Sequence, residues 1–214
     1  GRCLDRLFDG DIPSLTLASV RDAVQEFGVA LDELHQDSRT ITRHGDYEDA
    51  DRERTLRGRL RLAVTWGHNK DHRPDLKQLL YILTVTRDGA VPVQFRVESG
   101  NATDDRSHRA TWELLCKLTG RRDFLYVADC RLCSRASLAH ISKQGGRFLT
   151  VLPRNRREDK WFRQYVQVHE PPWDEAVRFP NPRRAQGPED VWKVVEAELP
   201  SREGYHIIWV WSSL

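Results

Sequence analysis

The sequence contains no methionine, and it begins at Gly1 rather than at an initiator residue. We therefore expect the chain to be a piece of a longer protein. It also contains no apolar run near the roughly 20 residues that cross a bilayer, and no secretory signal opens it. These absences predict a soluble, intracellular protein with no membrane partner.

Cysteine is scarce, with four residues in 214. A chain of this length without a secretory signal does not use four cysteines as a disulfide scaffold, so we expect reduced thiols. Cys130 and Cys133 form a Cys-x-x-Cys pair. Because Cys3 and Cys116 are isolated, the second ligand pair of a structural zinc site is missing, and zinc is the less favoured interpretation.

Net charge is small, because 34 Lys and Arg residues face 32 Asp and Glu residues. Any nucleic-acid surface must therefore come from local clustering. Five arginines between positions 52 and 61 form either a solvated charged loop or a loop that contacts phosphates. A second basic cluster follows Pro153, and its candidate DNA-binding residues are Arg154, Arg156, Arg157 and Lys160.

The most informative stretch is residues 124–129, a short apolar run that ends in Asp129. Its aromatic and β-branched content predicts a buried strand. Because a carboxylate is costly to bury unless it is paired or binds a metal, we expect Asp129 at the edge of a sheet, where open α/β sheets bind ligands. Asp129 is then either a metal ligand or the cap of a helix that begins near Ser134.

The remaining elements predict a mixed sheet with helices packed on it. The first strand carries a second carboxylate, Asp37, and Pro92 predicts that its own strand lies at an edge. If the strands of Asp37 and Asp129 are neighbours, the two acids can hold metal ions between them. The elements expected in order are strands at 34–42 and 60–66, a hairpin of strands at 79–86 and 91–97 around Asp88-Gly89, a helix capped by Asp104 or Asp105 and running to about Thr119, a strand at 124–129, a helix from Ser134, and a strand at 147–152.

Two further segments have more than one interpretation. The polar block at residues 67–78 is a candidate binding loop, in which Lys70, Arg73 and Lys77 either contact DNA or pair internally with Asp71 and Asp75. After Pro153, prolines and the runs 165–168 and 206–211 predict a small β-rich subdomain. Five of the seven tryptophans lie there, and they form either its core or a stacking platform for unpaired bases.

Taken in order, several motifs resemble those of the DDE transposases of bacterial insertion sequences, in the branch whose RNase H-like core is interrupted by a β-rich insertion. The resemblance implies an α/β fold with an RNase H-like mixed five-stranded sheet and flanking helices. It divides the chain into a helical lead-in at 1–33, a catalytic core at 34–155 and an insertion subdomain at 156–214. The motifs are Asp37-Ser-Arg-Thr, residues 67–78, Gly100-Asn101 with Asp104-Asp105, Val127-Ala-Asp129, Thr150-Val-Leu-Pro-Arg154 and Arg157-Glu-Asp.

The resemblance also implies a function. Asp37 and Asp129 would be the first two acids of a catalytic triad that holds two Mg²⁺ or Mn²⁺ ions. Such an enzyme cuts double-stranded DNA at the ends of an insertion sequence and joins the 3′-OH ends to target DNA. A homodimer paired across two DNA ends and a nucleoid-associated, cytoplasmic location are implied as well.

Two departures from the family pattern limit this expectation. The third acid is a Glu on a helix beyond the insertion, with a Tyr and an Arg before it and a Lys after it, and these 214 residues lack that pattern. Glu196, Glu198 and Glu203 do not match it, so we expect this chain alone to be inactive. Arg39 stands where small hydroxylated residues are usual and could disturb the metal site.

Two other functions fit the same residues. One is an RNase H-like nuclease that cuts DNA without strand transfer. The other is a non-catalytic DNA-binding remnant, whose DNA binding would fall with salt and would not depend on Asp37 or Asp129.

Overall fold

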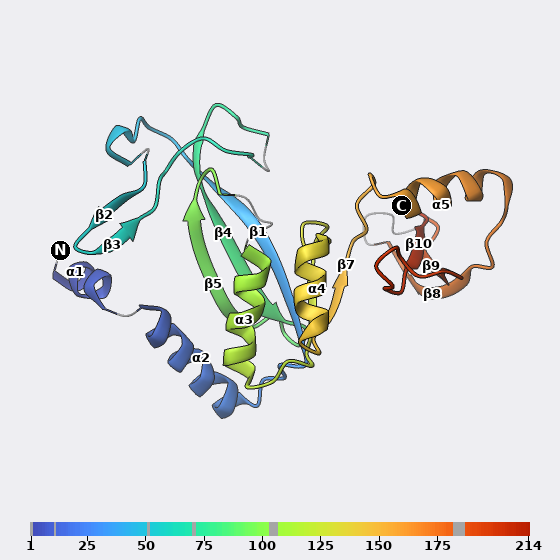
Figure 1. Cartoon of the computed structure of the whole chain (residues 1–214), viewed down its shortest axis with the longest axis horizontal. Helices are drawn as coiled ribbons and strands as arrows, with labels where there is room; N and C mark the ends of the chain where they lie inside the picture. The colour runs from blue at the N-terminus through green and yellow to red at the C-terminus, as the bar shows by residue number, and fades with distance from the viewer. Residues whose placement is uncertain (1, 11, 51, 70–71, 103–106, 182–186) are drawn as a thin grey trace. The chain divides into compact units, whose positions relative to one another are not determined.

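The computed structural model describes residues 2–10, 12–50, 52–69, 72–102, 107–181 and 187–214 (Figure 1). It divides into two compact units, Gly1–Val151 and Leu152–Leu214. The first unit opens with helices α1 (Arg2–Asp9) and α2 (Ile12–Phe27), and Gly28, at a left-handed φ of 62°, follows the second. No helix in the described ranges is both long enough and apolar enough to cross a membrane.

A five-stranded sheet forms the centre of the first unit, in the order β5-β4-β1-β6-β7. β1 pairs antiparallel with β4, and β4 with β5, whereas β6 and β7 continue parallel to β1. This mixed, RNase H-like sheet with its helices confirms the predicted fold class. The elements are β1 (Glu33–Arg43), β4 (Lys77–Thr86), β5 (Pro92–Ser99), α3 (Ser107–Thr119), β6 (Leu125–Ala128), α4 (Arg135–Lys143) and β7 (Arg147–Thr150).

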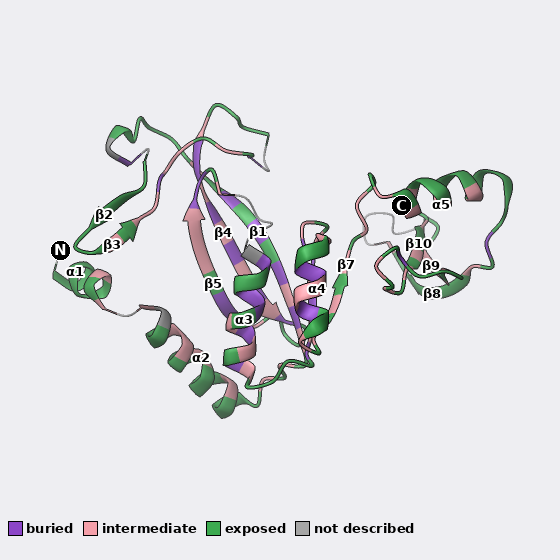
Figure 2. Ribbon diagram, in the orientation of Figure 1, coloured by how far each residue is buried: buried purple, intermediate pink, exposed green. Residues whose placement is uncertain are grey.

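The hydrophobic core lies between one face of the sheet and helices α3 and α4 (Figures 1 and 2). The even-numbered residues of β1 from Leu34 to Thr40 are buried, as expected for a strand with one covered face. Trp112 of α3 meets Phe124 in this core, with ring centroids 6.3 Å apart. The largest fully buried side chains are Trp112, Tyr126, Phe124, Leu34, Ile82, Leu115, Leu132 and Ile141.

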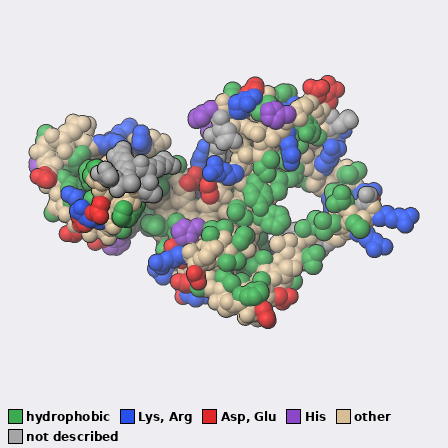
Figure 3. Space-filling model, turned by 180° about the vertical axis from the view of Figure 1, so that it is seen from behind, with side chains coloured by type: hydrophobic (Ala, Val, Ile, Leu, Met, Phe, Trp, Pro, Cys, Tyr) green, Lys and Arg blue, Asp and Glu red, His purple; other side chains and the backbone are tan. Residues whose placement is uncertain are grey.

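The opposite face of the sheet carries the odd-numbered residues of β1. Ile41 and, by strand register, Phe95 and Leu149 lie on this face, and all three are exposed. Figure 3 shows hydrophobic side chains gathered along the centre of the molecule as seen from behind. In the described part of the chain, the sheet therefore has one covered face and one face on which exposed apolar side chains lie beside the charged residues Asp37 and Arg39 of β1.

Two predictions for residues 45–66 are wrong. The arginine-rich stretch is not a simple loop, because β2 (Arg54–Leu56) and β3 (Arg59–Arg61) form a separate two-stranded sheet. The strand expected at 60–66 ends at Arg61. The prediction assumed that the alternating apolar residues were buried, but Leu60 and Trp66 are exposed and Ala63 between them is buried.

The predicted hairpin and edge strand are confirmed. β4 and β5 pair around the turn at Asp88-Gly89, and β5 is an edge strand of the sheet, the position at which proline is tolerated. The predicted cap of α3, Asp104 or Asp105, lies outside the described residues.

The second unit contains helix α5 (Arg157–Val168) and a three-stranded antiparallel sheet in the order β10-β9-β8. The strand predicted at 165–168 is wrong, because these residues form the last turn of α5. Tyr165 stacks on Trp161 one turn earlier, at 5.4 Å between ring centroids, so helical spacing overrides the β-branched residues. The strands are β8 (Asp174–Phe179), β9 (Asp190–Glu196) and β10 (Ile208–Ser212).

Aromatic side chains hold the second unit together. Phe162 stacks on Trp209 at 4.0 Å and meets Trp173 edge-on at 6.1 Å. None of the described aromatic side chains in this unit is fully buried, and Trp161 and Trp211 are exposed. The tryptophans therefore form a small aromatic cluster that keeps part of its ring surface open.

Candidate metal site

Strand pairing brings the two predicted acids together. β1 and β6 run parallel, and their register pairs Gln36 with Ala128 at the end of β6. The next residues along the two strands are Asp37 and Asp129. Two acidic residues that lie 92 positions apart in sequence (129 − 37) therefore occupy neighbouring positions on adjacent strands, at the edge where β6 ends.

Asp37 lies on the face of β1 that points away from α3 and α4. Its side chain is exposed, and its Oδ1 accepts a hydrogen bond from the Ser38 amide at 2.7 Å. Arg39, two residues further, lies on the same face and is also exposed. The structure therefore places a cation two residues from Asp37 on the same face of β1.

Asp129 is about half-exposed, with 43% of its side-chain surface accessible. Its Oδ1 accepts the Arg131 amide at 3.0 Å, and its carbonyl accepts the Thr150 hydroxyl at 2.6 Å. Helix α4 is capped by Ser134, whose hydroxyl accepts the Ser137 amide at 3.2 Å. The capping interpretation of Asp129 is therefore wrong, and its carboxylate faces solvent at the sheet edge.

Sequence reasoning missed a buried polar group beneath the acids. Gln36 of β1, His108 of α3 and Tyr126 of β6 are all buried. Tyr126 Oη donates to Gln36 Oε1 at 2.7 Å, and His108 Nδ1 lies 3.1 Å from Tyr126 Oη. Burial raises the pKa of Tyr126 well above its usual range. On the other side of the His108 ring, Nε2 lies 3.9 Å from Asp129 Oδ1.

The donor chemistry of the acid pair fits a hard divalent cation such as Mg²⁺ or Mn²⁺, which prefers carboxylate oxygens. The pair is not a complete cage, because no group of three or more His, Cys, Asp or Glu residues in the described ranges could hold a metal ion. Cys130 and Cys133 are free thiols. Within those ranges no second pair of ligands for a zinc site accompanies these two cysteines.

The structure changes the set of candidate DNA contacts in the 67–78 block. Lys77 is only 8% exposed, its ammonium donates to the Asp46 carbonyl, and it lies 4.7 Å from the centroid of the Trp66 ring. A buried, satisfied ammonium cannot reach phosphate, so that prediction for Lys77 is wrong. Arg73 is exposed but forms a bidentate pair with Asp75 at 2.9 and 2.6 Å. Lys70 lies outside the described residues.

In the second unit, Arg154, Arg157 and Lys160 are exposed and can reach an anionic partner. Arg156 is different, because it pairs with Glu158 at 3.3 Å and with Glu203. The hydrogen bond from Arg156 holds the pKa of Glu203 below its usual range. The ion pairs of Arg156 therefore indicate a structural role within this unit rather than contact with DNA.

Arg156→Gln is expected to lower the free energy of unfolding of the second unit by about 1–2 kcal/mol at pH 7. Because the folded pKa of Glu203 is lowered, the stabilisation is present above the usual glutamate pKa of about 4.3 and is lost as the pH falls below it. Urea unfolding followed by tryptophan fluorescence at pH 7 and pH 3 measures both effects. Arg157→Gln, which removes the exposed cation next to Arg156 at the start of α5, is the control and should change stability by less than about 0.5 kcal/mol.

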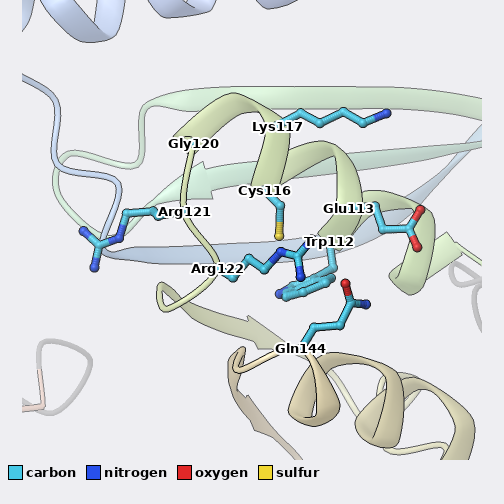
Figure 4. A pocket seen from close by; sticks show the side chains of 8 residues that line it. All are labelled: Trp112, Glu113, Cys116, Lys117, Gly120, Arg121, Arg122 and Gln144. Atoms are coloured by element: carbon cyan, nitrogen blue, oxygen red, sulfur yellow. The ribbon is translucent and has the colours of Figure 1, made fainter.

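A separate pocket of about 380 Å³ lies at the end of α3 opposite His108 (Figure 4). The side chains of Cys116 and Arg122 lie above the ring of Trp112 in this view, and burial raises the pKa of the Cys116 thiol. The pocket contains neither acid of the pair. Its lining residues are Trp112, Glu113, Cys116, Lys117, Gly120, Arg121, Arg122 and Gln144.

No protein-family model matches the chain, and no curated protein matches it. Two solved structures are similar to it, each with a TM-score of 0.34 and 10% sequence identity. One is a Mos1 transposase paired-end complex with the left transposon end, matched over 74% of this chain and 54% of that chain. The other is a pre-cleavage Mos1 transpososome, matched over 64% of this chain and 41% of that chain. The match thus spans about half or less of the Mos1 chains.

Proposed function

We propose that Asp37 and Asp129 are two of the metal-binding acids of a DDE transposase, and that the protein acts in DNA transposition. The observation that carries this proposal is the parallel pairing of β1 and β6, which makes the two acids neighbours at one edge of an RNase H-like sheet. The ordered sequence motifs around both acids support the same conclusion.

The residues present account for metal binding and orientation. Asp37 and Asp129 would hold the ions through carboxylate oxygens, at an edge that is open to a large substrate. When bound, two Mg²⁺ or Mn²⁺ ions supply activation of the attacking oxygen and stabilisation of the leaving oxygen in an in-line displacement at phosphorus. Thr150 fixes the backbone of Asp129 through its hydrogen bond to the carbonyl.

Double-stranded DNA, as element ends and as target, is the proposed substrate. Exposed cations at Arg154, Arg157 and Lys160 can neutralise phosphates, and binding through them would weaken as salt rises. The resemblance to DDE transposases supports a homodimer across two DNA ends. Strand transfer separates this proposal from a nuclease, because only a transposase joins a labelled 3′-OH end to a target plasmid.

These 214 residues are expected to bind DNA without cutting it, because the third acid of the family pattern is not among them. The measurement is nicking of a supercoiled plasmid by the chain in the presence of excess Mg²⁺. Asp129→Ala is the matched control, and both proteins should give the same background. Nicking by the chain that Asp129→Ala abolishes would contradict this expectation.

A further inference from the structure

The hairpin of β2 and β3 lies outside the hydrophobic core of the first unit. None of the residues in its two strands is buried. Arg57 and Gly58 form its turn, and both have a left-handed φ, at 49° and 75°, as a two-residue type I′ hairpin turn requires. Because an isolated two-stranded hairpin is at best marginally stable in water, this one depends on its attachment to the rest of the unit.

That attachment lies at the base of the hairpin. The Ser99 hydroxyl, at the end of β5, accepts a hydrogen bond from the Ala63 amide at 3.1 Å and donates one to the Glu53 carboxylate. Glu53 is the only acid in the sequence of residues 52–61. The one carboxylate of this stretch is therefore used at the base, away from the arginines near the turn.

Two of the arginines face each other across the hairpin. The strand register pairs Arg54 directly with Arg61, so both side chains leave the same face, with Cβ atoms about 4.5–5.5 Å apart. Like charges directly opposite each other destabilise an antiparallel pair of strands. Neither guanidinium forms a hydrogen bond or an ion pair within the described ranges. An anion bound between the two guanidinium groups would remove their repulsion.

Helix α1 engages the other two arginines of the strands and turn (Figure 1). Arg57 Nη1 lies 3.5 Å from an Asp5 carboxylate oxygen and 3.3 Å from one of Asp9. Arg59 Nη2 donates to the Asp9 carbonyl at 2.9 Å. The cross-strand pair therefore holds the two cations of the strands and turn that remain available to a partner.

We propose that the cross-strand pair of Arg54 and Arg61 binds a backbone phosphate of double-stranded DNA. A guanidinium presents parallel N–H donors that match phosphate oxygens, and two of them leave one face here. Residues 52–61 carry an excess of four positive charges (5 − 1), in a chain whose net charge is only +2. This inference rests on the proposed function, in which duplex DNA is the substrate, and it adds a contact surface in the first unit.

Arg54→Gln/Arg61→Gln tests the site. Fluorescence anisotropy of a labelled duplex of arbitrary sequence, between about 50 and 200 mM salt, gives the affinity and its dependence on salt. For the loss of one phosphate contact, the slope of log K against log salt should become about 0.9 less steep, and the affinity at about 0.1 M salt about tenfold weaker. Arg54→Lys/Arg61→Lys keeps both charges but not the planar forks, so it should keep the slope and bind with intermediate affinity.

Arg21→Gln/Arg122→Gln is the matched control, because it removes two exposed arginines of the first unit that lie outside the hairpin. Its affinity and salt slope should match those of the unmodified protein. Equal weakening in the control and in the hairpin variant would assign the effect to net charge and overturn the proposal. The urea midpoint of the hairpin variant should equal or exceed that of the unmodified protein, because its like-charge pair is gone.

The outcomes separate this inference from the proposed function. If the unmodified chain binds the duplex and Arg54→Gln/Arg61→Gln binds it as tightly with the same salt slope, the phosphate site is wrong and the DNA substrate stands. If the hairpin variant is weakened as expected, but Asp37→Asn and Asp129→Asn leave Mn²⁺ affinity unchanged, the phosphate site stands and the proposed metal function fails. If the unmodified chain binds no duplex at about 50 mM salt, where phosphate contacts are strong, both are overturned.

Discussion

Asp129→Asn is expected to weaken Mn²⁺ binding by at least about 100-fold. This loss is larger than the loss of metal affinity that typically follows when a residue hydrogen-bonded to a metal ligand is removed. The substitution removes the carboxylate and the charge of one of the two acids at neighbouring positions where β6 ends, while keeping the shape of the side chain. Asp37→Asn should have a similar effect, because each acid supplies half of the pair. Titration calorimetry at pH 7 measures both affinities.

The control for this prediction is Asp88→Asn. Asp88 is an exposed acid in the turn between β4 and β5, so its replacement removes the same charge away from the pair. Mn²⁺ affinity should not change. If both substitutions in the pair also leave the affinity unchanged, the pair is not a metal site. A loss in Cys130→Ser instead would assign the metal to the thiol pair.

Gly100→Ala is expected to lower the free energy of unfolding of the first unit by about 3 kcal/mol, at the upper end of the range for overpacking. A Cβ at this position would lie 2.1 Å from the Gln78 carbonyl oxygen and 2.4 Å from that of Thr65. Both are backbone atoms of one ladder, in which Thr65 and Gln78 exchange hydrogen bonds at 3.3 and 2.9 Å. Neither can move without breaking that pairing.

Gly28→Ala separates steric crowding from the general cost of replacing glycine. Gly28 has a left-handed φ of 62° but open space around its missing Cβ. Its replacement should cost only about 1 kcal/mol, the usual penalty for a left-handed residue. Chemical denaturation of both variants gives the comparison, and equal losses would show that backbone crowding at Gly100 does not matter.

Gly67 and the Gln78 side chain also meet at the Gly100 junction. Gly67 lies so near Gly100 that a Cβ there would be 1.9 Å from the Gly100 oxygen, and the Gln78 side chain donates to that same oxygen at 2.8 Å. Two of the motifs quoted for the resemblance therefore meet in one tightly packed crossing. Residues 67–78, predicted as a binding loop, contribute at least their ends to structure rather than to DNA contact.

Local rules predicted the parts of the fold that depend on a few residues. The turn at Asp88-Gly89 and the edge position forced by Pro92 follow from backbone chemistry alone, and both are confirmed. Whether Asp37 and Asp129 lie on neighbouring strands depends on which strands pair, and the sequence alone does not give the strand order. The parallel register of β1 and β6 places the two residues on neighbouring strands.

The failures have physical reasons. At 60–66 the alternation placed the apolar side chains inside, but Ala63 is the buried residue and Leu60 points to solvent. At 165–168 aromatic contacts along one helical face outweighed β propensity. Nothing in the sequence around Lys77 indicated that its ammonium would lie against a backbone carbonyl and an indole ring.

His108 shows the limit of sequence reasoning at the site itself. A lone histidine near the start of a helix is an ordinary core residue by pattern, and Tyr126 is one aromatic in an apolar strand. Only the crossing of α3 over β6 and β1 joins them to Gln36 and directs Nε2 towards Asp129. No spacing rule along the chain could have found a contact among three separate elements.

The most direct test of the central claim is anomalous diffraction from crystals of the 214-residue chain soaked in Mn²⁺. If Asp37 and Asp129 form the metal site, the strongest anomalous peak will lie within coordination distance of carboxylate oxygens from both residues. It will disappear in Asp129→Asn crystals soaked in the same way. Manganese bound elsewhere, with no peak between these two carboxylates, would contradict the proposed function.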